Sequence, residues 1–114
     1  MLIRFPAGSS VKMTFTLTDV SSLEGGTAEY VMADSPKDSP FLTLKSSGSQ
    51  VILPYKENEG DPENRVRVYL LPADTDGKTG WKYHELRIRL GVEGGVIASG
   101  VDVRIDPTIT THAE

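Results

Sequence analysis

Residues 81–106 read WKYHELRIRLGVEGGVIASGVDVRID, and this stretch decides the fold class. In its first half, Leu86, Ile88 and Leu90 fall on one side of an extended chain, because successive side chains of a strand point to opposite faces. Alternation on both sides of a tight glycine turn at 93–95 predicts a β-hairpin. The second half alternates in the same way, and its shared face is made by Ile97, Val101, Val103 and Ile105.

The rest of the chain carries shorter segments of the same kind, separated by turn residues. Residues 11–17 alternate apolar side chains with lysine and threonine, which is typical of a strand with one wet face. Two apolar runs flank Ser46–Ser49 and predict a second hairpin. No segment shows a helical repeat, and each strand has one core face, which favours two stacked sheets over a barrel. The pattern predicts an all-β fold, an antiparallel β-sandwich of seven to nine strands.

The inward positions of these strands predict the core. We expect Trp81 to pack at one end of it, because a large aromatic side chain suits the edge of a sandwich. The predicted core residues are Val11, Met13, Phe15, Leu17, Tyr30, Leu42, Leu44, Val51, Leu53, Val66, Val68, Leu70, Leu86, Ile88, Leu90, Val101, Val103 and Ile105.

Length and composition indicate one acidic globular domain. The 114 residues fit a sandwich over 1–106 and a polar tail over 107–114. The net charge is −4, with 12 basic and 16 acidic residues interleaved, so nucleic acid is not an expected partner. The absence of cysteine excludes a disulfide, a thiolate metal site and a cysteine nucleophile. The hydropathy pattern predicts neither a leader peptide nor a membrane partner.

Histidine and acidic residues, which often serve in catalytic or metal sites, show no such arrangement in this sequence. His84 and His112 have no partners at the spacing of a metal site or a serine triad. Asp-Thr-Asp-Gly at 74–77 resembles the start of a calcium loop, but no glutamate follows at the required distance, and a local turn explains it equally well. We therefore expect no enzyme activity, no metal and no cofactor.

A cluster of four acidic residues lies between 56 and 64, in the longest loop of the chain. Paired carboxylates act as the acid and base of glycosidases when they line a walled cleft. A loop with glycine and proline predicts a solvated acidic surface instead. The four residues are Glu57, Glu59, Asp61 and Glu63.

Several arginines are predicted to point outward from the strands. They would either form cross-strand charge pairs on a wet face or belong to a polar docking surface, since arginine is enriched at interfaces. The polar tail would add to such a surface by pairing with a neighbour's free sheet edge. The candidate interface residues are Arg87, Arg89, Arg104, Thr108, Ile109, Thr110, Thr111 and His112.

Aromatic residues leave a second binding class open. Trp and Tyr rings on one exposed face would stack on sugar rings, which would make the chain a carbohydrate-binding β-sandwich module. The same residue types also serve as core and edge residues of sandwiches. The four candidates are Tyr55, Tyr69, Trp81 and Tyr83.

The C-terminal half contains motifs of a known family. Leu-Pro-Ala-Asp-Thr at 71–75 precedes Gly-Trp-Lys-Tyr-His-Glu-Leu-Arg-Ile at 80–88. Ala-Ser-Gly-Val-Asp-Val at 98–103 and Asp-Pro-Thr-Ile-Thr at 106–110 follow. This half resembles the immunoglobulin-like domain at the N-terminus of tailed-phage baseplate upper proteins and related tail and head-fibre proteins. Gly-Ser-Ser at 8–10 and the strand after it are similar to the first long strand of that domain.

The resemblance implies an immunoglobulin-like sandwich and a structural role without catalytic residues. It implies a non-enzymatic protein of a tailed-phage virion, in the tail, baseplate, fibre-attachment region or capsid decoration. Such a protein is assembled in the host cytoplasm and resides in the virion. Its partners would be other virion structural proteins, as a homo-oligomer or a multi-copy assembly. In that family the domain usually leads a longer protein, so this chain is expected to act as an adaptor or decoration subunit.

Overall fold

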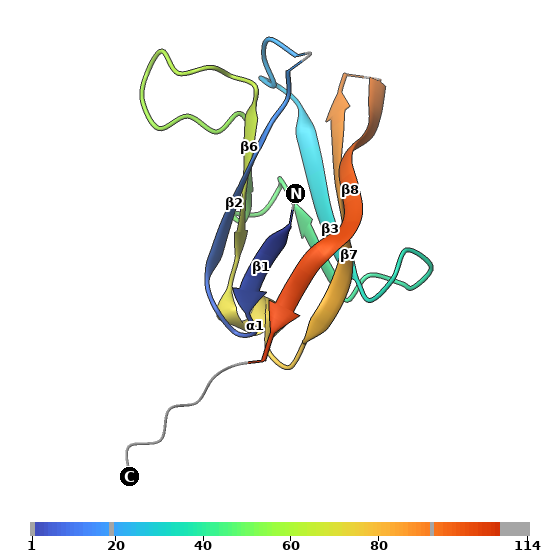
Figure 1. Cartoon of the computed structure of the whole chain (residues 1–114). Helices are drawn as coiled ribbons and strands as arrows, with labels where there is room; N and C mark the ends of the chain where they lie inside the picture. The colour runs from blue at the N-terminus through green and yellow to red at the C-terminus, as the bar shows by residue number, and fades with distance from the viewer. Residues whose placement is uncertain (1, 19, 92, 108–114) are drawn as a thin grey trace.

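Two sheets packed face to face make up the protein (Figure 1). The computed structural model describes residues 2–18, 20–91 and 93–107; within the last strand it describes the side chains at 94, 95, 100 and 103–106. These residues contain eight strands and one helical turn. The elements are β1 (Ile3–Pro6), β2 (Val11–Thr16), β3 (Thr27–Ala33), β4 (Leu42–Lys45), β5 (Val51–Ile52), β6 (Arg65–Leu70), α1 (Pro72–Thr75), β7 (Gly80–Leu90) and β8 (Glu93–Asp106).

The strand order confirms the predicted all-β, immunoglobulin-like sandwich. The larger sheet has the order β1-β8-β7-β3-β4, and the smaller sheet has the order β2-β6-β5. In both sheets neighbouring strands run antiparallel, except β1 and β8 of the larger sheet, which run parallel. In immunoglobulin nomenclature β2, β6 and β5 are strands B, E and D, while β3, β7 and β8 are strands C, F and G. β4 extends the larger sheet beside β3, as strand C′ extends the corresponding sheet of variable-type domains.

The β7–β8 hairpin forms as predicted, but its turn lies earlier than predicted. Leu90 pairs with Glu93, so Gly94 and Gly95 belong to β8. Gly91 has a φ of +63°, a region that glycine enters without a steric penalty. A Cβ added to Gly94 would lie 3.1 Å from the carbonyl oxygen of Ile88. Gly94 therefore permits a close strand approach, which the sequence pattern does not distinguish from a turn.

The predicted hairpin around Ser46–Ser49 is wrong. β4 pairs with β3 in the larger sheet, whereas β5 pairs with β6 in the smaller one. The segment between them crosses from one sheet to the other. Both Leu44 and Val51 reach the core, but they do so from opposite layers. Alternation shows which face of a strand is apolar, and it does not show which sheet the strand joins.

The predicted core is confirmed wherever the side chains are described. Leu23, in a segment predicted only as a loop, is also fully buried, and its backbone N–H donates to the carbonyl of Glu63. The side chains at 97 and 101 lie outside the described residues. The predicted residues that are buried are Met13, Leu17, Tyr30, Leu44, Val51, Val66, Val68, Leu70, Leu86, Ile88, Val103 and Ile105. Those packed against them and partly buried are Val11, Phe15, Leu42, Leu53 and Leu90.

A polar contact crosses the middle of this apolar core. The hydroxyl of Tyr30 on β3 lies 2.9 Å from Nδ1 of His84 on β7 and 3.9 Å from the sulfur of Met13 on β2. The rings of Tyr30 and His84 meet edge to face with centroids 5.6 Å apart. In antibody domains the disulfide between strands B and F packs against a tryptophan on strand C. Here the same three strands meet through a hydrogen-bonded tyrosine.

Two further buried polar residues fasten the end of the sandwich near α1. Thr75 is fully buried, and its hydroxyl oxygen accepts a 3.0 Å hydrogen bond from the N–H of Gly8, between β1 and β2. Lys82 on β7 is also buried, and its ammonium donates to Asp34 at 2.7 Å. The hydrogen bond and charge of Lys82 lower the pKa of the Asp34 carboxyl.

Removing the hydroxyl of Tyr30 should destabilise the core, because its bond to His84 joins β3 to β7 and its contact with Met13 reaches β2 of the other sheet. Tyr30→Phe keeps the ring but loses a buried hydrogen bond, so the free energy of unfolding should fall by about 1 kcal/mol. Tyr30→Ala also empties the volume of the ring and should lower it by about 3–5 kcal/mol. Urea unfolding followed by circular dichroism measures both. Tyr69→Phe, on the outer side of β6, is the control and should stay within about 0.5 kcal/mol of wild type. Equal stability of Tyr30→Phe and wild type would contradict this role.

The contact between Lys82 and Asp34 should make stability depend on pH. Because the pKa of Asp34 is lower in the folded state than in the unfolded chain, the stabilisation is present above the unfolded pKa and disappears as pH falls through the folded pKa. Asp34→Asn should lower the free energy of unfolding by about 1 kcal/mol at neutral pH, since the carboxylate is largely exposed. The difference from wild type should shrink as the pH falls from neutral to about pH 2. An equal difference at both pH values in urea unfolding would refute it.

Candidate docking surfaces

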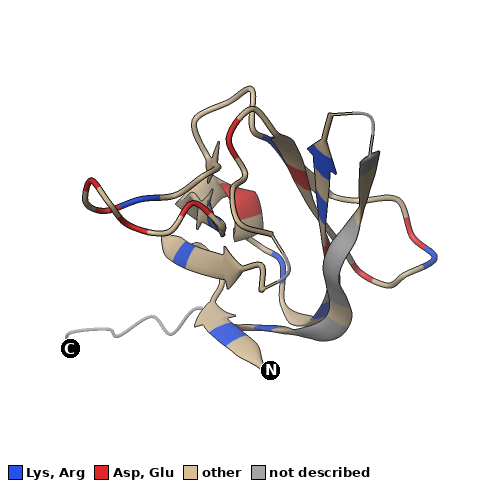
Figure 2. Cartoon of the chain, turned by 90° about the horizontal axis from the view of Figure 1, so that it is seen from above, with Lys and Arg blue, Asp and Glu red and all other residues tan. Residues whose placement is uncertain are grey.

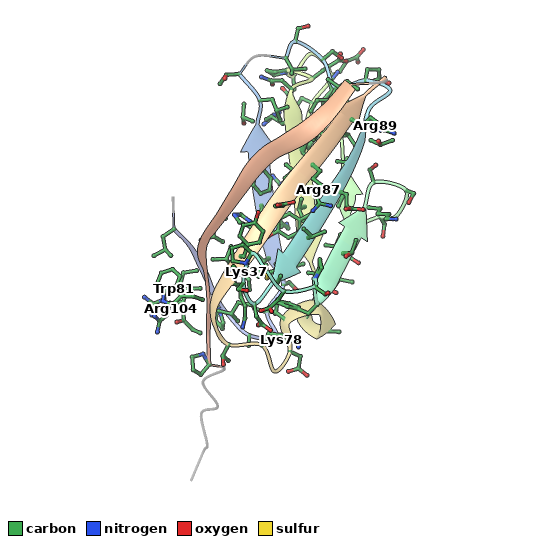
Figure 3. All side chains as sticks on the ribbon, turned by 90° about the vertical axis from the view of Figure 1, so that its right-hand side faces the viewer. Lys37, Lys78, Trp81, Arg87, Arg89 and Arg104 are labelled. Carbon is green, nitrogen blue, oxygen red and sulfur yellow. The ribbon has the colours of Figure 1, made fainter. Side chains whose placement is uncertain are left out.

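The outer face of the larger sheet carries a row of three side chains that cross its strands. Arg4 on β1 pairs with Arg104 on β8, and Arg104 pairs with Trp81 on β7. We call these three residues the tryptophan row. The guanidinium carbon of Arg104 lies 5.6 Å from the centre of the Trp81 ring, and both residues lie at the same edge in Figure 3. The row combines an indole with two cations on a regular sheet.

The prediction that Trp81 packs at the end of the core is wrong. Its side chain is 52% exposed and points outward. The neighbours Lys82 and His84 take the inward positions of β7, so Trp81 falls on the opposite face with Tyr83 and Glu85. If the alternation that begins at Leu86 is continued back to residue 81, it predicts that Trp81 points outward.

Asp106 holds the two arginines of the tryptophan row. Its carboxylate accepts a hydrogen bond from Nε of Arg4 at 2.7 Å and one from Nε of Arg104 at 3.4 Å. The Arg4 hydrogen bond is the main reason why the pKa of Asp106 lies below its usual range. Both arginines are thereby oriented before any partner arrives, which reduces the entropy lost on binding.

The middle of the same face is a charge network of the kind expected for a wet sheet. Arg87 lies 3.1 Å from Glu29 on β3 and 2.6 Å from Glu85, its neighbour along β7. The hydroxyl of Tyr83 donates to Glu85 and is the main cause that lowers the pKa of this carboxyl. Arg87 is therefore committed to cross-strand pairs. Arg89 is exposed, lies near the far end of the face in Figure 3, and forms no ion pair with the residues that the structure describes.

The structure places the candidate interface residues unevenly. Arg87, Arg89 and Arg104 all lie on the outer face of the larger sheet, but only Arg104 contacts Trp81. The five candidates in the tail, Thr108, Ile109, Thr110, Thr111 and His112, lie outside the described residues. β8 ends at Asp106, so the tail begins next to the tryptophan row.

The four aromatic candidates for sugar stacking do not form one platform. Trp81 and Tyr83 lie on β7 of the larger sheet, whereas Tyr69 lies on β6 of the smaller sheet and Tyr55 is bonded to β6 through its backbone N–H. An open groove of about 1040 Å³ at the crossing from β4 to β5 has Ala28, Val51, Leu53 and Ile88 among its lining residues. None of the described residues that line it is aromatic.

The outer face of the smaller sheet carries a cluster that the sequence analysis missed. The guanidinium carbon of Arg67 lies 4.1 Å from the centre of the Tyr55 ring and 5.7 Å from that of Tyr69. Its Nε donates a 2.8 Å hydrogen bond to the hydroxyl of Thr14 on β2. We call Tyr55, Arg67 and Tyr69 the arginine–tyrosine stack. Tyr55 follows β5 in the chain, so only the tertiary structure brings it to Arg67.

The acidic cluster of the 56–64 loop divides into two pairs. Asp61 accepts hydrogen bonds from the backbone of Glu57 at 3.0 Å and of Asn58 at 2.9 Å, and Glu63 accepts one from Ser22 at 2.8 Å. These bonds lower the pKa of both carboxyls, with the Asn58 and Ser22 bonds as the respective main causes. Glu57 and Glu59 are exposed and make no ion pair with described residues. The loop is thus an ordered turn with two outward carboxylates.

The other chemistry candidates have local structural roles. His84 is buried between the sheets, and His112 lies outside the described residues. Asp74 accepts hydrogen bonds from the N–H of Leu71 and the side chain of Gln50, both at 2.8 Å, and so caps the turn α1. In residues 2–18, 20–91 and 93–107, no three acidic or histidine side chains are grouped to hold a metal ion.

Comparisons with known proteins give the chain no family name. No model of a protein family matches it, and no curated protein sequence does. Among the described residues, no helix has the length and apolar character needed to cross a membrane.

Removing Arg4 should change the titration of Asp106. Because the Arg4 hydrogen bond is the largest cause of the lowered pKa, Arg4→Gln should raise the pKa of Asp106 toward its ordinary value, with Arg104 retaining part of the effect. NMR titration of the side-chain carboxyl carbon measures this shift. Arg87→Gln, in the middle of the same sheet, is the matched control and should leave Asp106 unchanged. An unchanged pKa in Arg4→Gln would contradict the proposed orientation of the row.

Proposed function

We propose that this chain is a non-enzymatic structural protein of a tailed-phage virion that acts through protein–protein assembly. Its place would be the tail, the baseplate, the fibre-attachment region or the capsid surface, with other virion structural proteins as partners. The chain would be made in the host cytoplasm and then reside in the particle. The observation that carries the assembly role is the tryptophan row on the outer face of the larger sheet.

The composition of the tryptophan row favours a protein partner. Trp81 leaves about half of its surface in water although indole is mostly apolar, and covering apolar surface stabilises a complex by roughly 25 cal/mol per Å². Tryptophan and arginine are the residue types most enriched among interface hot spots. Here Arg104 stacks on Trp81, and Asp106 fixes Arg104 and Arg4. A partner would thus meet an ordered apolar ring with a polar rim.

The phage assignment is supported by where the family-like motifs lie. The segment at 80–88 lies within β7, and the segment at 98–103 lies within β8. These two strands form the hairpin that presents Trp81 and Arg104. Trp81 thus lies within one of the motifs that resemble phage immunoglobulin-like domains, and Arg104 directly follows another. A carbohydrate-binding role has one favourable feature, the exposed indole of Trp81, which by itself can stack on a sugar ring.

The proposal predicts that the chain travels with particles and needs Trp81 to do so. A tagged chain expressed in the infected host should co-sediment with intact virions in a density gradient, as detected by immunoblot. Trp81→Ala should reduce the bound amount by about tenfold or more, the effect of losing one hot spot. Thr43→Ala, an exposed residue of β4, is the control and should bind like wild type.

Two outcomes would overturn the proposal. One is a chain that stays at the top of the gradient while virions sediment. The other is a Trp81→Ala variant that folds and binds particles like wild type. Binding to a glycan array that is lost in Trp81→Ala, together with absence from particles, would establish the carbohydrate-binding alternative.

A further inference from the structure

The outer face of the smaller sheet is basic although the chain is acidic. Strand pairing places Thr14 of β2 beside Arg67 of β6, Arg67 beside Ile52 of β5, and Lys12 beside Tyr69. Lys12 and Arg67 form no ion pair with any residue that the structure describes. The three strands of the smaller sheet contain no acidic residue, whereas the net charge of the whole chain is −4. We call these five residues and Tyr55 the small-sheet face.

The side chains of the small-sheet face are ordered for binding. Arg67 is stacked with Tyr55 at 4.1 Å and uses one N–H for its 2.8 Å bond to Thr14. A guanidinium has five N–H donors in a planar fork, so most of them remain available for a carboxylate. Ile52, next to Arg67, is 40% exposed and adds apolar surface that a partner would cover. The face therefore suits a protein segment that carries carboxylates.

The chain itself contains such a segment. The 56–64 loop projects beyond the strands at one end of the smaller sheet (Figure 1), and its acidic residues are shown in red in Figure 2. Asp61 and Glu63 fix the loop through hydrogen bonds to its own backbone and to Ser22. Glu57 and Glu59 point outward from this fixed turn and form no ion pair with a described residue. A preorganised acidic loop loses little conformational entropy on docking.

We propose that the 56–64 loop of one copy docks on the small-sheet face of a second copy. Glu57 and Glu59 would pair with Lys12 and Arg67, and Ile52 would be covered. Charge-assisted hydrogen bonds to arginine are stronger than neutral ones. The loop and the face are different surfaces, so the contact either is made twice in a two-fold dimer or repeats head-to-tail in a ring or a filament. This inference rests on the proposed assembly function and names the chain itself as one partner, through a surface separate from the tryptophan row.

Charge reversal tests the contact directly. Sedimentation of the isolated chain should show association that grows with concentration at about 0.02 M salt and weakens by about tenfold or more at about 0.5 M salt, because salt screens exposed charges. The variants K12E/R67E and E57K/E59K should each be monomeric. An equimolar mixture of the two should associate again, since each variant then offers a surface of the sign that the other needs.

A matched control separates this contact from a general charge effect. The double variant K37E/R89E changes the net charge as much as K12E/R67E does. Because Lys37 and Arg89 do not belong to the small-sheet face, this variant should associate like wild type. Wild type that stays monomeric at low salt, a mixture that fails to associate, or a control that dissociates equally would overturn the inference. Co-sedimentation with virions by a chain that is monomeric alone would leave the proposed function intact while removing this contact.

Discussion

The hydrogen bond between Tyr30 and His84 is the contact on which the rest of the structure depends. It lies among the buried side chains of β2, β3 and β7. Immunoglobulin domains often join the strands that correspond to β2 and β7 by a disulfide, and this chain has no cysteine. Burying polar groups is unfavourable unless they are bonded, so the pair favours one register of β3 against β7. That register sets which residues of β7 face inward. Trp81 is consequently held on the outside, at the opposite face of the same strand.

The two outer faces of the sandwich differ in how their charges are satisfied. On the larger sheet, Arg87 pairs with Glu29 and Glu85, and Asp106 holds both arginines of the tryptophan row. On the small-sheet face, Lys12 and Arg67 have no carboxylate among the described residues. Packed sheets lie about 10 Å apart, so the two faces can engage different partners at once. This division would let a single small domain act as a connector.

Part of the candidate site could be predicted from the sequence. The outward positions of Arg87, Arg89 and Arg104 follow from the two-residue period of their strands, and the structure places all three on the outer face. The same period places Trp81 outward, but its bulk favoured the core in the prediction, and that was wrong. The arginine–tyrosine stack could not be predicted, because Tyr55 and Arg67 meet only after the chain has turned through the 56–64 loop. Residues far apart in sequence have no periodic signal in common.

The sequence by itself determined the fold class, the approximate strand positions and the core face of each strand, because side-chain alternation is a local property of an extended chain. Apart from the β7–β8 hairpin, only the tertiary structure decided which strands pair. It joined β4 to β3 and β5 to β6 in place of the expected hairpin, and it set β1 parallel to β8. It also divided the acidic loop into carboxylates that fix the turn and carboxylates that face outward. Such choices depend on packing between two layers, where every strand offers a similar apolar face and only the assembled core distinguishes them.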